Sequence, residues 1–158
     1  MSRELFTSWP DYQMAIDRVL ALARQRISIY DEDLGLLHLE TPERIAALKA
    51  ALSAVRSDCL RIALRNTGPL QQRQPLLQGL LTDYSHNSAA QQTPEQLGHL
   101  RDSMILVDDA HALIRFDRDQ PRCKLLIDEI DEVTPYRRRF EEIWAEGGIP
   151  VSATTLGL

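Results

Sequence analysis

Apolar residues recur at three- and four-residue steps along four stretches of the chain, which is the spacing of one face of an amphipathic helix. The second stretch begins with Thr41-Pro42-Glu43 and the last with Thr134-Pro135. Threonine is a common N-cap, and proline is favoured at the first helical position. We therefore predict four helices, over residues 12–24, 41–55, 76–84 and 134–146.

Short apolar runs bounded by polar or turn residues predict five strands. The run Met104-Ile105-Leu106-Val107 is the strongest, and the polar tract 85–92 has two interpretations, an edge strand or a loop. Helices and strands alternate early, as in the crossover units of a parallel sheet, whereas the later strands resemble an antiparallel meander. We predict an α/β fold, a mixed β-sheet flanked by helices. The predicted strands are 27–30, 59–64, 104–107, 112–116 and 124–127.

The composition is that of an ordinary globular domain, with 158 residues, 44% hydrophobic and 26% charged. We expect a single domain over residues 1–158, with a core of about 12–148, that folds without disulfides or a structural metal. The net charge of −5 disfavours global binding to nucleic acid or anionic membranes and leaves a local basic patch open.

The sequence predicts a cytoplasmic location. The N-terminus lacks the basic-then-apolar pattern of a signal peptide, and no stretch reaches the roughly 18 apolar residues needed to span a bilayer. Cys59 and Cys123 have neither CxxC spacing nor a neighbouring histidine. We interpret them as reduced, half-buried thiols.

Carboxylates gather after two of the predicted strands, as Asp31-Glu32-Asp33 and as Asp108-Asp109. Clustered carboxylates bind divalent cations through hard oxygen ligands, and they are also common turn formers. We favour turns here. The alternative is a metal site, and His111, close to Asp109, is a further candidate as a general base.

Arginine strongly outnumbers lysine in this chain. Arg137-Arg138-Arg139 fan around the last predicted helix, which is typical of a solvated face paired with neighbouring glutamates. The alternative is a phosphate-binding patch formed with Arg61, Arg65 or Arg101, because arginine binds oxyanions bidentately. The motifs of nucleotide-binding loops, serine hydrolases and zinc proteases are absent.

The segment from Arg101 through Met104–Val107 to Asp108-Asp109 resembles the catalytic motif of phospholipase D-like enzymes. That motif has a histidine, a lysine two residues on, and an aspartate five residues later at the end of an apolar strand. By this resemblance Asp108 holds the aspartate position, Arg101 the histidine position and Ser103 the lysine position. The glycine-serine pair and the asparagine that usually follow are missing from Ala112–Phe116.

Much of the chain also resembles an uncharacterised proteobacterial domain with a degenerate phospholipase D-like fold, found alone or fused behind GNAT-type acetyltransferases. This resemblance rests on the order of several short pieces between Tyr12 and Leu158. The pieces are Leu60–Leu64, Gly68-Pro69-Leu70, Arg73, Leu76–Leu81, Val107-Asp108-Asp109 and Phe140–Trp144.

The resemblance implies a non-catalytic phospholipase D-like domain used for binding or regulation, without a cofactor. Arginine stays protonated and cannot act as the nucleophile, and serine lacks the charge of the lysine. The implied partners are a second copy of the chain, an acetyltransferase encoded separately, and a phosphate-bearing ligand or nucleic acid, with no membrane. The ligand-binding candidates are Arg101, Ser103, Asp108, Arg61 and Arg65. The alternative is a metal-assisted phosphodiesterase or other hydrolase that uses Asp31, Asp33, Asp108 and Asp109.

Overall fold

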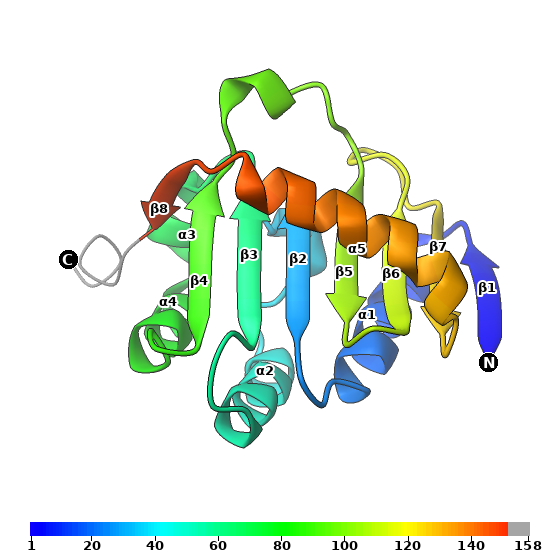
Figure 1. The fold of residues 1–158 in the computed structure, drawn as a ribbon, viewed down its shortest axis with the longest axis horizontal. Helices are drawn as coiled ribbons and strands as arrows, with labels where there is room; N and C mark the ends of the chain where they lie inside the picture. Colours follow the sequence, from blue (N-terminus) through cyan, green and yellow to red (C-terminus); the bar gives the residue numbers. More distant parts are fainter. Residues whose placement is uncertain (152–158) are drawn as a thin grey trace.

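One mixed β-sheet of eight strands forms the centre of the computed structural model, which describes residues 1–151 (Figure 1). The strand order across the sheet is β1-β7-β6-β5-β2-β3-β4-β8. The sheet therefore joins strands from both ends of the described chain. The strands are β1 (Ser2–Phe6), β2 (Ile27–Asp31), β3 (Leu60–Leu64), β4 (Ser88–Gln92), β5 (Ser103–Val107), β6 (His111–Arg115), β7 (Cys123–Ile127) and β8 (Ile149–Val151).

Helices cover both faces of the sheet, and each face has its own layer of buried apolar side chains. Helices α1 to α4 pack on one face, and α5 crosses the other (Figure 1). The helices are α1 (Trp9–Ala21), α2 (Pro42–Ala54), α3 (Gly68–Arg73), α4 (Pro75–Asp83) and α5 (Ile130–Ala145), with short 3₁₀ turns η1 (Gly35–Leu37) and η2 (Glu95–Leu97).

The sheet changes from parallel to antiparallel at β2. Strands β2, β3 and β4 run parallel, whereas β5, β6 and β7 form an antiparallel meander whose first strand pairs antiparallel with β2. This confirms the predicted mixed sheet and its division into two halves. Because of the reversal, the C-terminal ends of β2, β3, β4 and β6 lie at the same end of the strands as the N-terminal end of β5.

Two strands and one α-helix were not predicted from the sequence: β1, β8 and α3. Strand β1 contains no apolar run, and its side chains alternate between exposed and half-buried. The ambiguous tract 85–92 contains β4, which pairs with β3 on one side and β8 on the other, so it is not an edge strand.

Helix α5 begins at Ile130, about one turn before the predicted start at Thr134. The Thr134 hydroxyl donates to the Ile130 carbonyl at 2.7 Å, so it does not act as an N-cap, and Pro135 lies inside the helix. The predicted cap of α2 is confirmed, because the Thr41 hydroxyl accepts the backbone N–H of Arg44 at 3.2 Å.

Both cysteines are free, and both are buried more deeply than predicted. Burial raises the pKa of the Cys59 and Cys123 thiols to about 11, which keeps them protonated and unreactive near neutral pH. Within residues 1–151, no helix has the length and apolar character that crossing a membrane requires.

Candidate functional site

Three buried polar residues meet at the side of the sheet where β2 ends, in the row formed by the ends of β2 and β6 and the start of β5. Asp31 is the last residue of β2, Ser103 the first of β5, and Arg115 the last of β6. The register pairs Tyr30 with Met104 and Ser103 with Arg115, which places the three residues in one row. Their exposed fractions are only 1–2%. In open α/β sheets, ligands commonly bind at the carboxyl ends of the strands where the strand order reverses.

Asp31 and Arg115 form a buried ion pair, with 3.1 Å between Oδ1 and Nη2. The second oxygen of Asp31 accepts the backbone N–H of Leu34 at 2.7 Å. Arg115 Nη1 donates to the Arg118 carbonyl at 2.7 Å. Burial raises the pKa of the Asp31 carboxyl, and the nearby Arg115 charge opposes that shift. Each charge thus has a partner of opposite sign and a backbone hydrogen bond, which buried charges require.

The guanidinium of Arg115 is also enclosed by aromatic rings of α1. Its central carbon lies 5.6 Å from the centroid of the Trp9 ring and 5.0 Å from that of Tyr12, within the range of cation–π attraction. Ser103 lies beside it, and its side chain is buried. The centre of this site is therefore filled by an arginine that the family motif does not contain.

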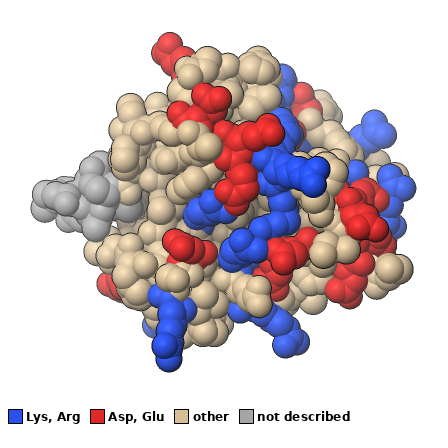
Figure 2. All heavy atoms as spheres, viewed as in Figure 1, with Lys and Arg blue, Asp and Glu red and all other residues tan. Residues whose placement is uncertain are grey.

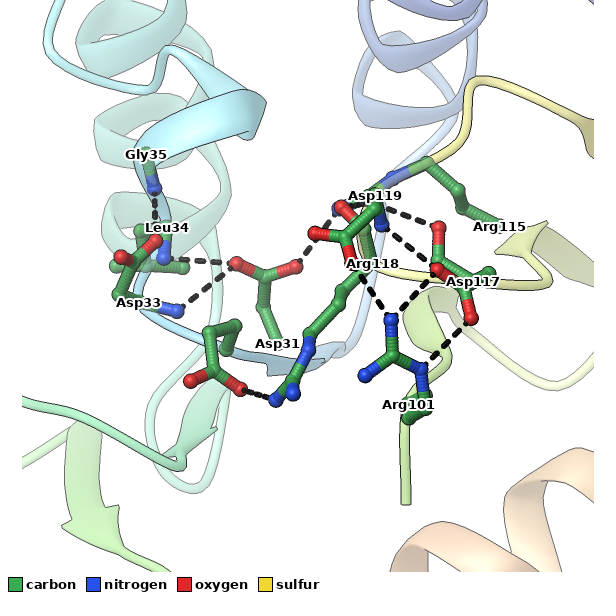
Figure 3. Close-up of polar contacts among 10 residues, drawn as sticks. Asp31, Asp33, Leu34, Gly35, Arg101, Arg115, Asp117, Arg118 and Asp119 are labelled. Carbon is green, nitrogen blue, oxygen red and sulfur yellow. Dashed lines mark hydrogen bonds and ion pairs between the residues drawn. The ribbon is translucent and has the colours of Figure 1, made fainter. Parts of the chain in front are cut away.

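Arg101, which precedes β5, is held by two carboxylates from the segment after β6 (Figure 3). Its Nε donates to Asp117 at 2.8 Å and its Nη2 to Asp119 at 2.6 Å. The hydrogen bond from Arg101 lowers the pKa of Asp117 to about 2. Asp117 and Asp119 thus neutralise Arg101 near neutral pH.

A cavity of about 240 Å³ opens beside the Asp31–Arg115 pair. Arg118, on its wall, pairs with Glu32 at 2.8 Å, while the Asp33 carboxylate accepts the backbone N–H of Gly35 at 2.8 Å. Carboxylates outnumber guanidinium groups on this wall, so the cavity is not electropositive. The lining residues are Asp31, Glu32, Asp33, Gly35, Leu36, Arg115, Arg118 and Asp119.

Asp108 lies at the opposite end of β5 from Arg101 and Ser103. Its carboxylate accepts the backbone N–H groups of three successive residues, Arg24, Gln25 and Arg26, at 2.8–3.1 Å. At about 3.4 Å per residue, the length of β5 separates Asp108 from Ser103 by roughly 17 Å. Asp108 therefore holds the segment before β2 and cannot share a ligand with Arg101.

The same geometry corrects the four-carboxylate metal hypothesis. Asp31 and Asp33 lie at one edge of the sheet, and Asp108 and Asp109 follow β5 at the other. Four ligands of one cation must lie within a few ångströms of each other, so these four cannot act together. Within residues 1–151, no cluster of histidine, cysteine and carboxylate side chains is placed to hold a metal ion. His111 accepts the backbone N–H of Asp128 through Nδ1 at 3.0 Å.

Arg61 lies on the α5 side of the sheet, at the opposite end of the strands from Arg101. Arg61 forms a two-bond pair with Glu141 of α5, and its guanidinium lies over the ring of Trp144, 5.4 Å from the centroid. Arg65 follows β3 at the edge where β2 ends. Arg61 and Arg101 therefore cannot contribute to one phosphate-binding patch.

The arginine run of α5 was expected to form a solvated face paired with neighbouring glutamates, and only Arg138 is exposed. Arg137 pairs with Asp109 at 3.4 Å, and Arg139 forms a two-bond pair with Asp102. Basic side chains near the centre of this face are bordered by acidic ones (Figure 2). Arg137 and Arg139 thus join α5 to carboxylates at the two ends of β5.

The sequence reasoning missed Arg115, Asp117 and Asp119. Arg115 was read as an ordinary strand residue, because a single charge at the end of an apolar run indicates no partner. The closely spaced charges of Asp117-Arg118-Asp119 gave no distinct signal, because acidic residues are common in turns.

The sheet and its flanking helices define a phospholipase D-like fold. Nuc from Salmonella typhimurium, a phospholipase D family member, matches with a TM-score of 0.65 and 13% identity over 96% of this chain and 99% of its own. NucT from Helicobacter pylori matches with a TM-score of 0.61 and 12% identity over 92% of this chain and 96% of its own. The chain belongs to the family described as Domain of unknown function (DUF7931), whose model matches residues 10–152.

A further structural match is TrmBL2, an archaeal chromatin protein whose structure shows a novel mode of DNA binding. The TM-score is 0.65 with 15% identity over 92% of this chain, which spans about half (53%) of the TrmBL2 chain. No curated protein matches the sequence. At these identities the structural matches establish the fold alone.

Proposed function

We propose that this chain is a non-catalytic phospholipase D-like domain that acts by binding or regulation. One observation carries the proposal. The position that the family motif gives to its nucleophile holds Arg101, whose guanidinium is bound by Asp117 and Asp119. A guanidinium stays protonated near neutral pH and offers no lone pair for attack on phosphorus.

The surrounding residues support the same conclusion. Ser103, at the lysine position, is buried and uncharged, so it supplies no positive charge to phosphate oxygens. The one guanidinium beside it, that of Arg115, is already paired with Asp31. A phosphate-bearing ligand at Arg101 would have to displace Asp117 and Asp119, and the acidic cavity wall opposes that exchange.

Three partner proposals follow from the family resemblance. The first is a second copy of the chain, because single-motif members of the superfamily resemble half of a two-fold site. The second is an acetyltransferase encoded separately. The third, nucleic acid, is supported by the DNA binding of TrmBL2, and both the net charge of −5 and the mixed charge of the α5 face weigh against it.

The test is a phosphodiesterase assay on the purified full chain. The substrates are bis(p-nitrophenyl) phosphate and single-stranded DNA, each with EDTA and with Mg²⁺ or Mn²⁺. We expect the same rate as in buffer under every condition. Turnover that disappears in Arg101→Ala and persists in the exposed control Arg73→Ala would overturn the proposal. Turnover that needs metal and disappears in Asp33→Asn would instead support a hydrolase.

A further inference from the structure

The segment between β4 and β5 arches over the end of the strands at which the candidate site lies (Figure 1). Its middle part, residues 94–100, contains no buried residue. The hydrogen bonds of this part are local, because the backbone N–H groups of Leu97, Gly98 and Leu100 each donate to the carbonyl three residues earlier. To the rest of residues 1–151 it makes no hydrogen bond and no ion pair. A segment with so few contacts belongs to the least stable part of a fold.

Both ends of the segment, in contrast, are firmly attached. At the first end Thr93 is buried, and its backbone N–H donates to the carbonyl of the last residue of β3 at 2.8 Å. At the second end Arg101 is held by the two carboxylates that follow β6, and Asp102 is paired with Arg139 of α5 through two hydrogen bonds. Residues 94–100 therefore form a short span between two fixed points.

Buried polar groups without a hydrogen-bond partner lie next to this span. Tyr30 is 1% exposed, and within residues 1–151 its hydroxyl has no partner. The Nε of Arg65 and the hydroxyl of Thr93 are likewise buried and unpaired in this part of the chain. Gly98 lies against Arg65, because a Cβ added to the glycine would be 2.9 Å from Nη2. Buried polar groups are nearly always paired, so the closed position of the span deprives these groups of the water that would pair with them.

Two leucines hold the span in place. Leu97 and Leu100, both half-buried, pack against the buried cluster that contains Tyr30. Their contact with α5 is incomplete, because a cavity of about 200 Å³ remains between the span and that helix. Packing of two side chains thus favours closure, whereas each unpaired polar group favours opening by roughly 5- to 150-fold. The residues that line the cavity are Leu97, Leu100, Arg139, Glu142, Ile143 and Glu146.

We propose that residues 94–100 form a lid, which opens between its fixed ends and lets water reach the Tyr30 hydroxyl and the Arg65 Nε. The open lid exposes these groups at the same end of the strands as the candidate site. The domain thus has two forms of this surface, and a partner that binds only one form shifts the population toward it. Because Arg101 stays bound to its carboxylates in both forms, the lid is independent of whether the domain hydrolyses phosphodiesters.

The experiment is native-state proteolysis of the full chain with thermolysin, which cleaves on the amino side of leucine. We expect cuts before Leu97 and Leu100, identified by mass spectrometry, to precede any cut within a helix or strand. Their rate should exceed the rate that global unfolding, measured in urea, allows. Cleavage of a transiently open segment follows the population of the open form when closing is faster than cleavage.

Three variants test what opens the lid. Tyr30→Phe keeps the ring and removes the hydroxyl that closure deprives of water, so the cuts should slow by about fivefold or more. Tyr84→Phe is the matched control, because the Tyr84 hydroxyl is paired with Ser53 at 2.8 Å, and its cut rate should equal that of the wild type. Ile143→Val shortens the α5 side chain in the cavity wall and should speed the cuts by about two- to tenfold.

Three results would overturn the proposal. One is the absence of cuts within residues 94–100 before the helices and strands are cut. Another is cutting at Leu97 and Leu100 only at the rate of global unfolding. The last is the same cut rate in Tyr30→Phe as in the wild type, because opening would then leave the hydroxyl buried. Melting temperatures measured in parallel establish that each variant is folded at the temperature of the assay.

Discussion

The buried pair of Asp31 and Arg115 allows a quantitative prediction. Replacing Arg115 with Met keeps most of the side-chain volume between the Trp9 and Tyr12 rings and removes the charge. Asp31, only 2% exposed, is then left as a buried carboxylate that keeps its backbone hydrogen bonds and loses its counter-charge. Removing one partner of a buried ion pair costs about 3–5 kcal/mol of unfolding free energy.

The double variant separates the contribution of the ion pair to stability from the contributions of the two individual residues. In Asp31→Asn/Arg115→Met both charges are gone, and the Asn oxygen can still accept the backbone N–H groups of Asp33 and Leu34. Replacing both members of a buried pair is often close to neutral. We therefore expect the unfolding free energy of the double variant to lie within about 1–2 kcal/mol of that of the wild type. It should also be higher than that of Arg115→Met.

Urea unfolding of the wild type, Asp31→Asn, Arg115→Met and the double variant, followed by circular dichroism, measures these free energies. At about 2–4 °C per kcal/mol for a chain of this size, Arg115→Met should also melt about 6–20 °C below the wild type. Arg118→Met is the control, because Arg118 and Glu32 are about one-third exposed and such pairs contribute about 0–1 kcal/mol. A loss in Arg115→Met no larger than in Arg118→Met would refute the reasoning. Additive losses in the double variant would refute it as well.

Three further predictions concern single residues. Asp117, whose pKa is lowered to about 2 by Arg101, stabilises the fold above its unfolded pKa of about 4. The urea midpoints of the wild type and Asp117→Asn should therefore differ at pH 7 and converge as the pH falls through 2. The pKa of Tyr30 is raised to about 12, so the unfolded chain loses the phenol proton first and stability should fall between about pH 10 and 12. In Tyr30→Phe the slope of melting temperature against pH should be smaller over this interval. Asp108→Ala removes the acceptor of three backbone N–H groups from a residue with φ of +53°. It should lower the unfolding free energy measured in urea by about 2–4 kcal/mol. Asp108→Asn keeps an acceptor oxygen and tolerates this φ, so its loss should be less than half as large.

The mixed sheet was predictable because its central strands are short apolar runs with turn residues at both ends. Strand β1 was not, since Ser-Arg-Glu-Leu-Phe has no such run and forms a strand only because β7 supplies hydrogen bonds. The start of α5 was misplaced because Thr134-Pro135 has the sequence of a helix start, while the observed N-cap residue, Glu129, makes no side-chain capping bond.

The candidate site was less predictable than the fold. Asp108 and Arg101 are close in sequence and were therefore assigned to one site. They lie at opposite ends of the extended strand β5. Asp31 and Arg115 lie far apart in sequence, and only the pairing of β5 with both β2 and β6 brings them together.

The pairing of β1 with β7 has a consequence for the synthesis of this protein. Ser2 is opposite Ile127, so β1 finds its hydrogen-bonding partner only after every element between β1 and β7 has been translated. Until then Phe6 cannot take its place against the buried core cluster. Because contacts between distant segments slow folding, β1 should become resistant to proteolysis later than β2 and β3 during synthesis.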